Sequence, residues 1–207
     1  VTVLLIIAGA GDVTGDGVPD LLVGQPLATG LSPSSGAAWV HAGPFDGDRT
    51  LDAGFRLGGE QTDDFAGGAC DGVGDINGDG ISDVLVGAWG HDTGGVFSGA
   101  TYLLHGPIAA DRALADADTT TVGFTTWDVL GFAVAGAGDT NGDGLDDVII
   151  GAYGHDRGGL SAGGAWVFLG PFSSGDLLTA AAVVLGEAED DMVGWAVAGA
   201  GDTDGDG

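Results

Sequence analysis

Four copies of one acidic motif recur along the chain and place residues that could bind a cation at regular intervals. The copies begin at Gly11, Gly74, Gly138 and Gly201. In each copy an oxygen-bearing side chain stands at every second residue, and in the three complete copies a further Asp closes the motif. All of these donors are oxygens in a short glycine-rich loop, which suits Ca²⁺ better than the more rigid site that Mg²⁺ requires. The single Cys and four His form no cluster that would suit zinc.

We therefore predict three complete calcium loops and a truncated fourth. Each complete loop would use side chains at positions one, three, five and nine and the backbone carbonyl at position seven. The predicted ligands are Asp12, Thr14, Asp16, Val18 and Asp20 in loop one, Asp75, Asn77, Asp79, Ile81 and Asp83 in loop two, Asp139, Asn141, Asp143, Leu145 and Asp147 in loop three, and Asp202, Asp204 and Asp206 in loop four.

Two other interpretations of the loops are open. An EF-hand loop begins similarly but continues to an acidic residue at position twelve and into a helix. Here apolar runs such as VLVGA and VIIGA follow position nine, and these indicate strands. Asx turns without an ion are the second alternative, although several unpaired carboxylates within one loop would repel each other. Calcium loops remain the better interpretation.

The charge of the chain excludes some classes of partner. It carries 31 acidic residues against four arginines, has no lysine, and has a formal net charge of −27. Nucleic acid is excluded as a partner because phosphate binding requires clustered Lys and Arg. Anionic membrane surfaces are disfavoured for the same reason. Adaptation to high salt could contribute to the acidity, but it would not explain the periodic placement of the Asp residues.

The segments between the loops read as short β-strands. These apolar runs are four to eight residues long, are rich in Val, Ile, Leu and aromatic residues, and are bounded by Gly or Pro. About four such runs occur in each repeat, which predicts an all-β protein built from β-propeller blades of four antiparallel strands. We assign residues 1–207 to one repeat array, with repeats at about 1–64, 65–129 and 130–192 and a partial one at 193–207. The small residues of AVAGAG suit the innermost strand of a blade.

Three repeats and a fragment are too few to close a ring, because propellers have about 4–8 blades. We therefore expect the chain to be part of a longer protein. The alternative is a structural subunit that self-assembles head-to-tail into a homo-oligomer or filament through its incomplete terminal blades.

With these motifs the chain resembles the FG-GAP repeats, which form the propeller of integrin α-chains and occur in many bacterial extracellular proteins. The resemblance rests on the Gly-Asp-x-Asn-x-Asp-Gly-x-x-Asp loops. The name-giving pairs are looser: Phe65-Ala66, Leu130-Gly131 and Val193-Gly194 stand at the first position, and Gly24-Gln25-Pro26, Gly87-Ala88-Trp89 and Gly151-Ala152-Tyr153 at the second. The resemblance implies a propeller with calcium between the first two strands of a blade.

Catalysis has little support in the sequence. His91-Asp92 and His155-Asp156 could supply a base and its orienting group for a propeller-based hydrolase. Because both pairs follow the same strand of successive repeats, we favour a role in turns and predict that the protein is not an enzyme. Among the tryptophans, Trp39, Trp166 and Trp195 are predicted to pack between blades, whereas Trp127 is the better candidate for the surface.

The remaining expectations concern location and ligand. No run reaches the ~18–20 apolar residues of a membrane span, so we expect no membrane insertion. The opening VTVLLIIAGAG is interpreted as a strand. Extracellular calcium would fill such loops, so we expect a non-catalytic, secreted or cell-surface adhesion protein that binds a protein or glycan ligand.

Overall fold

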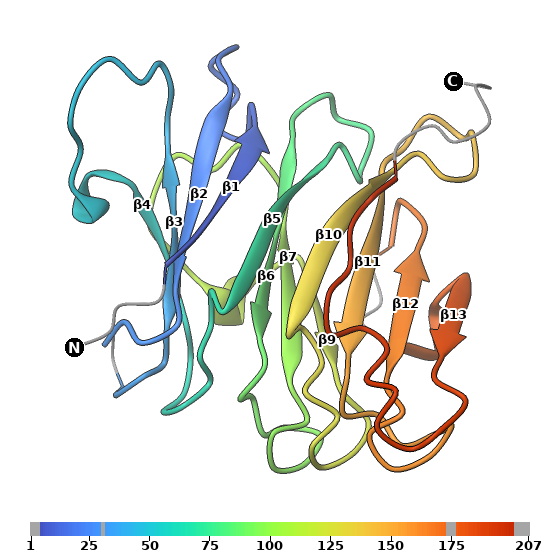
Figure 1. Cartoon of the computed structure of the whole chain (residues 1–207). Helices are drawn as coiled ribbons and strands as arrows, with labels where there is room; N and C mark the ends of the chain where they lie inside the picture. Colours follow the sequence, from blue (N-terminus) through green and yellow to red (C-terminus); the bar gives the residue numbers. More distant parts are fainter. Residues whose placement is uncertain (1–4, 30–31, 173–176, 201–207) are drawn as a thin grey trace.

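The computed structural model describes residues 5–29, 32–172 and 177–200 (Figure 1). Within these ranges the chain forms thirteen β-strands and three short 3₁₀ turns, with no α-helix. The prediction of an all-β protein is thereby confirmed.

The strands form three separate sheets, which stand beside one another in chain order (Figure 1). The first contains β1 (Ile6–Gly11), β2 (Asp20–Gln25), β3 (Ala37–His41), β4 (Phe55–Gly58) and β8 (Arg112–Ala113). The second contains β5 (Ala69–Gly74), β6 (Asp83–Ala88), β7 (Ala100–Leu104) and β9 (Thr119–Val122). The third contains β10 (Ala133–Gly138), β11 (Asp147–Ala152), β12 (Gly164–Phe168) and β13 (Ala182–Leu185). The 3₁₀ turns are η1 (Leu51–Ala53), η2 (Leu114–Asp116) and η3 (Leu177–Thr179).

These sheets are consistent with blades of a β-propeller, and we number them 1 to 3. Blades 2 and 3 each have four antiparallel strands, as predicted. Blade 1 has a fifth strand, because the connection between β7 and β9 contributes β8, which pairs in parallel with β4. The extra strand ties blade 2 to the outer edge of blade 1.

The middle strands of blade 2 are buried on both faces, which accounts for their apolar sequences. All six residues of β6 and all five of β7 are buried, so both faces of this sheet are covered. A strand covered on both faces requires a nearly continuous apolar run rather than an alternating one. The runs DVLVGA and ATYLL have this character.

The first strands of the three blades, β1, β5 and β10, lie side by side (Figure 1). Their backbones approach so closely that a Cβ added to Gly72 would lie 2.6 Å from the Cα of Ala10. The Gly136 N–H also donates to Asp71 Oδ2 at 3.1 Å. Small residues are required here because larger side chains would separate the blades, so the expected innermost position of AVAGAG is confirmed.

Two further details concern the outer strand of blade 3 and the tryptophans. The strand β13 begins at Ala182, because η3 precedes it. Trp39 and Trp166 are buried as predicted. Trp195, from the partial fourth repeat, packs against Phe132 and Tyr153 of blade 3 and is 52% exposed. Trp127 is 57% exposed, as expected for a surface residue.

Candidate metal centre

The three complete acidic loops occupy the same place in each blade. They connect the first strand to the second: β1 to β2, β5 to β6, and β10 to β11. Each loop begins directly after a register shift in the preceding strand pair. In loop two the backbone turns sharply at Gly78 and Gly80, whose φ angles of 81° and 83° favour glycine. The fourth loop, with Asp202, Asp204 and Asp206, lies outside the described residues.

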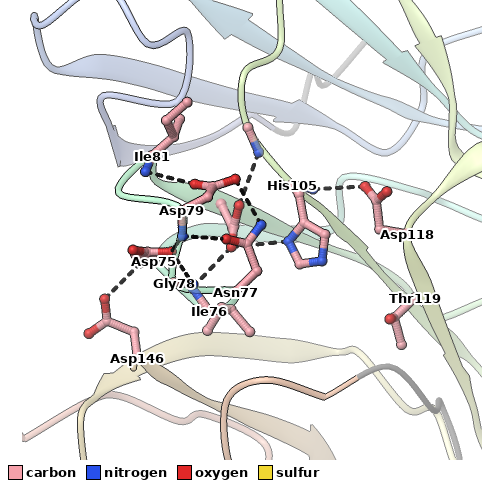
Figure 2. A network of polar contacts seen from close by, with 12 residues as sticks. Asp75, Ile76, Asn77, Gly78, Asp79, Ile81, His105, Asp118, Thr119 and Asp146 are labelled. Carbon is pink, nitrogen blue, oxygen red and sulfur yellow. Dashed lines mark hydrogen bonds and ion pairs between the residues drawn. The ribbon is translucent and has the colours of Figure 1, made fainter. Parts of the chain in front are cut away.

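The carboxylate at position one organises each loop from within. Asp75 Oδ1 accepts hydrogen bonds from the N–H groups of Gly78 and Asp79 at 2.7 and 3.1 Å (Figure 2). Its Oδ2 accepts a third from the Gly80 N–H at 2.8 Å. Asp139 accepts the equivalent three bonds in loop three, and Asp12 accepts two in loop one. These donors, led by the Gly144 N–H, lower the pKa of Asp139, so this carboxylate is held in its anionic form.

Positions three and five form the exposed tip of the loop. Asn77 Oδ1 accepts the Asp79 N–H at 2.8 Å, and Asn77 Nδ2 donates to Asp79 Oδ2 at 3.0 Å. Asp79 Oδ1 accepts the Ile81 N–H at 2.9 Å. Loop three repeats all three bonds with Asn141 and Asp143. The oxygens of positions one, three and five are therefore turned toward the inside of one small loop.

The closing Asp at position nine has a second role that the sequence did not indicate. Asp83 is fully buried, and its two oxygens accept the N–H groups of Ile76 and Gly106 at 3.0 Å each. The His105 Nδ1 lies 3.1 Å from its Oδ2, and burial raises the pKa of this carboxyl. Asp20 and Asp147 make the matching bonds to Gly43 and Gly170. The residue thus joins the loop to the end of the third strand.

The chemistry of the donors fits a hard cation, although the described residues do not form a complete metal-binding shell. No group of three or more His, Cys, Asp or Glu side chains converges within the described ranges. Thr14 Oγ1 at position three of loop one is buried and has no hydrogen-bond partner there, which leaves an oxygen free for a ligand. No Arg or His among the described residues pairs with a carboxylate at position one or five. The ligand assignments therefore remain predictions.

Neighbouring loops are connected to each other across the blade junctions. Asp146, at position eight of loop three, accepts the Asp75 N–H on its Oδ2 at 2.7 Å, and its own N–H donates to the Asp75 carbonyl at 3.1 Å (Figure 2). In loop two the Ser82 N–H donates to the Asp12 carbonyl at 3.4 Å. Asp12 and Asp75, which lead loops one and two, are thus each held by position eight of the loop in the next blade.

His91 and His155 follow β6 and β11, at the ends of these strands opposite the acidic loops. His91 Nδ1 is 3.3 Å from Asp64 Oδ1, and His155 Nδ1 is 3.1 Å from Asp128 Oδ1. Asp64 and Asp128 belong to the linkers that join successive blades, and both are buried. The bond from Asp64 raises the pKa of His91 above its ordinary value. Each pair therefore fastens a blade to the linker that precedes it.

The Asp that follows each histidine in sequence has a different partner. Asp92 Oδ1 accepts the Phe97 N–H, and Asp156 Oδ1 accepts the Ser161 N–H, both at 2.8 Å. Ser98 Oγ donates to the His91 carbonyl rather than facing its ring. The suggested base-and-orienter pairs are thus not formed, because Asp92 and Asp156 close turns while the histidine rings point to other carboxylates.

Comparison with known proteins agrees with this architecture. The FG-GAP repeat family matches residues 6–41 and 130–168, which contain β1 to β3 and β10 to β12 with loops one and three. The chain contains FG-GAP repeats. Integrin alpha-PS2 of Drosophila melanogaster is 32% identical over 157 residues, which cover 70% of this chain and 11% of that protein. Integrin alpha-2 of Bos taurus is 36% identical over 88 residues, which cover 41% of this chain and 7% of that protein.

The FG-GAP chain thus spans about a tenth of the length of these curated relatives. Both relatives are integrin α-chains, and the chain is similar to them over the regions that align. Within the described residues no helix is long and apolar enough to cross a membrane.

Proposed function

We propose that this chain is a non-catalytic, calcium-binding β-propeller segment of an extracellular adhesion or surface protein. The observation that carries the proposal is the repeated loop between the first two strands of each blade. In loops two and three, backbone hydrogen bonds turn the oxygens of positions one, three and five inward, and in loop one they do so for positions one and five. When bound, Ca²⁺ would supply the positive charge that the protein itself does not place there.

Electrostatics supports a cation at these loops. Loop two carries carboxylates at positions one, five and nine, and loop three adds a fourth at position eight. With a net charge of −27, the rest of the chain offers few cations to offset their mutual repulsion. Ca²⁺ accepts six to eight oxygen ligands in flexible geometry, which a nine-residue loop with one backbone carbonyl and several carboxylates can approach.

The position of the loops suggests what calcium would do. Asp75 leads loop two and is also held by Asp146 of the next blade. Ordering loop two would therefore order the junction between blades 2 and 3 as well. Because the folded loop binds calcium and the unfolded chain has no preformed site, calcium would stabilise the folded protein.

The extracellular adhesion role rests on the likeness to integrin α-chains. Millimolar calcium outside cells would keep loops of modest affinity filled, which agrees with a secreted or cell-surface location. The ligand would be a protein or a glycan. A propeller-based hydrolase has less support, since both histidines pair with linker carboxylates. The hydroxyl of Thr93 lies 2.7 Å from His91 Nε2, but the equivalent position of blade 3 holds Arg157, so the arrangement is not repeated there.

Thermal unfolding with and without calcium tests the proposal. We expect the melting temperature to rise with calcium and to fall when a chelator is added, with about 2.7 kcal/mol of stabilisation per site when calcium exceeds the Kd by about a hundredfold. Asp79→Asn combined with Asp143→Asn should reduce this response, whereas the exposed Asp52→Asn should not. An identical melting temperature in calcium and in chelator would contradict calcium binding.

Head-to-tail self-assembly is the alternative, and both outer faces do expose apolar residues, among them Ile7 and Val184. The junction contacts weigh against it. Blade 1 has Pro19 at position eight, which has no N–H to donate, and Ala28 where the later blades have His91 and His155. A second copy presenting blade 1 would therefore lack two contacts of the internal junctions. Filaments of the isolated chain in negative-stain images would favour the alternative.

A further inference from the structure

An exposed aromatic stack lies at the end of blade 2 opposite its acidic loop. The rings of Phe97 and Trp127 are parallel within 5°, with centroids 4.7 Å apart. Trp89 stacks behind Phe97 at 6.0 Å, and Phe65 stacks behind Trp89 at 4.3 Å. Trp127 ends this row and is 57% exposed, so one face of its indole is supported while the other is open.

Equivalent positions in the other two repeats hold polar residues. The N–H groups of Phe65, Val129 and Met192 donate to Ser34, Phe97 and Ser161 respectively, each at 3.1 Å, which aligns Phe97 with the two serines. The N–H groups of Asp63, Trp127 and Asp190 likewise donate to Pro33, Val96 and Leu160, which aligns Trp127 with the two aspartates. The same turn is therefore built twice with Ser and Asp and once with Phe and Trp.

The aromatic pair stands where the backbone disfavours it. Phe97 and Trp127 have φ angles of 54° and 68°, and the equivalent serines and aspartates have similar positive values. Asp tolerates this left-handed region far better than bulky residues do. The turn itself does not need the aromatic rings, since two other copies form without them. Residues that break a local rule without a structural need often mark functional sites.

The linker that carries Trp127 is also unusually neutral. From Thr119 to Trp127 it has no ionisable side chain, whereas the matching parts of the other linkers include Glu60 and Asp63, or Glu187 and Asp190. Exposed Thr126 adds a hydroxyl beside the indole. Asp92 lies beside Phe97, but the two linker carboxylates that the other repeats carry are missing here, so the spot suits a cationic ligand less than its equivalents do. The net charge of −27 repels an anionic ligand. A neutral ligand rich in hydroxyl groups fits best.

We propose that Trp127, supported by Phe97, is a stacking platform for a hexopyranose ring of a neutral glycan. The C–H bonds on one face of such a ring carry partial positive charge and pack on the negative face of an indole, while its hydroxyl groups reach neighbouring polar atoms. The proposal names a ligand class for the adhesion role above, but it does not require that calcium binds. Phe97 follows β6, whose other end joins loop two, and Trp127 follows β9.

The test uses the intact chain in calcium, with neutral methyl hexopyranosides followed by NMR and with an array of neutral, sialylated and sulfated glycans. We expect neutral sugars to shift the Trp127 indole N–H resonance and neutral glycans to be retained. Trp127→Asp should lower the affinity by about tenfold or more. This variant should fold, because Asp occupies the equivalent left-handed position twice. Phe97→Ser, matched to Ser34 and Ser161, should weaken binding less.

Trp195→Phe is the control, since Trp195 is also exposed but lies at the side of blade 3. Retention of no neutral glycan, or equal affinity in Trp127→Asp, would overturn the proposal. Trp127-dependent binding of an arginine-rich peptide in place of sugars would overturn it as well. The calcium response of the melting temperature, measured on the same samples, should be unchanged by Trp127→Asp, which separates failure of this proposal from failure of calcium binding.

Discussion

Some residues of the acidic loops hold the backbone of the loop in place, and others offer oxygen atoms that could bind a cation. Asp75 and Asp139 use both carboxylate oxygens to wind the backbone, and Asp83 and Asp147 join the loop to a neighbouring strand end. The spacing of Asp residues that suits calcium is therefore also a spacing that folds the loop. Loop one differs at position three, where it has Thr14.

Replacing Thr14 by Asn should strengthen loop one. The Thr14 hydroxyl is buried without a partner, and an amide oxygen is a better calcium ligand than a hydroxyl. We expect the tightened loop to bind calcium severalfold more strongly in isothermal titration. Thr14→Val should have the opposite effect with little change in the fold. Equal affinity in all three proteins would show that position three of loop one does not contact the ion.

His91→Ala should destabilise the protein more at pH 5.5 than at pH 8.5. The bond to Asp64 raises the pKa of His91, so its stabilising contribution is full below the unfolded value of 6.5 and is lost as the pH rises through the folded pKa. We expect a loss of about 1–3 kcal/mol at the lower pH in urea unfolding, because a buried carboxylate loses its charged partner.

His41 provides a control of opposite sign. Burial lowers its pKa, so the folded state resists protonation of His41 and stability falls as the pH drops through 6.5. Replacing His41 by Ala should therefore remove a penalty at pH 5.5, whereas replacing His91 removes a stabilising bond. If both variants showed the same pH trend, the assigned role of His91 would be wrong.

At the scale of elements, the close approach of first strands fixes the spacing of the blades. Gly72 of β5 faces the backbone of β1, and Gly136 of β10 faces that of β5. These contacts, with the loop-to-loop bonds and the pairs of histidine and aspartate, make each junction a set of three contacts repeated along the chain. Stability should therefore respond to changes at junctions more than to changes at free edges.

Gly72→Ala should destabilise the protein by about 1–3 kcal/mol, because the new methyl group would meet the Ala10 backbone, which cannot move away cheaply. Gly9 occupies the same position in β1, and a Cβ there would meet nothing within 4 Å. Gly9→Ala is thus a matched control that should leave the free energy of unfolding nearly unchanged in urea titrations. Equal effects of the two substitutions would contradict close packing of β1 and β5.

Asp146→Ala should loosen the junction between blades 2 and 3. It removes the 2.7 Å bond to the Asp75 N–H, which is worth about 1 kcal/mol, without removing a predicted ligand. We expect calcium affinity to fall more at loop two than at loop three. The amide resonances of Gly80 and Gly144 report the two loops separately during an NMR calcium titration. Asp52→Ala controls for the loss of one negative charge.

At the scale of the whole molecule, charge opposes folding. A net charge of −27 on a chain with only four arginines produces self-repulsion that must be offset by packing, by screening and, as we propose, by bound calcium. The packed part of the chain consists of two clusters, one shared by blades 1 and 2 and the other by blades 2 and 3.

Monovalent salt should raise the melting temperature, and it should do so more in chelator than in calcium. Without calcium the loop carboxylates are screened only by mobile ions, whose effect grows as the Debye length shrinks from about 10 Å at 0.1 M to about 3 Å at 1 M salt. Differential scanning calorimetry over a range of KCl concentrations measures this. An equal salt slope in the two conditions would indicate that the loops do not bind calcium.

Much of the fold could be predicted because repetition reduces ambiguity. A period near 63 residues, strands bounded by Gly, and small residues in AVAGAG were enough to predict blades and the innermost strand. Other features could not be predicted. The pairing of β8 with β4 depends on the path of the long connection between β7 and β9. The partner of His91 is Asp64, 27 residues away, rather than the adjacent Asp92. Local pattern carries no information about such contacts.

The sequence alone determined the donor chemistry of the loops, the short apolar runs that form strands and the excess of negative charge. Each of these follows from residue types or from their local spacing. Only the tertiary structure decided which oxygens are already held by backbone amides, which blade holds which linker, and that Phe97 and Trp127 meet as parallel rings. Those facts depend mostly on residues that are far apart in the chain, within one repeat or in neighbouring ones, and tertiary packing rather than any local preference sets their distances.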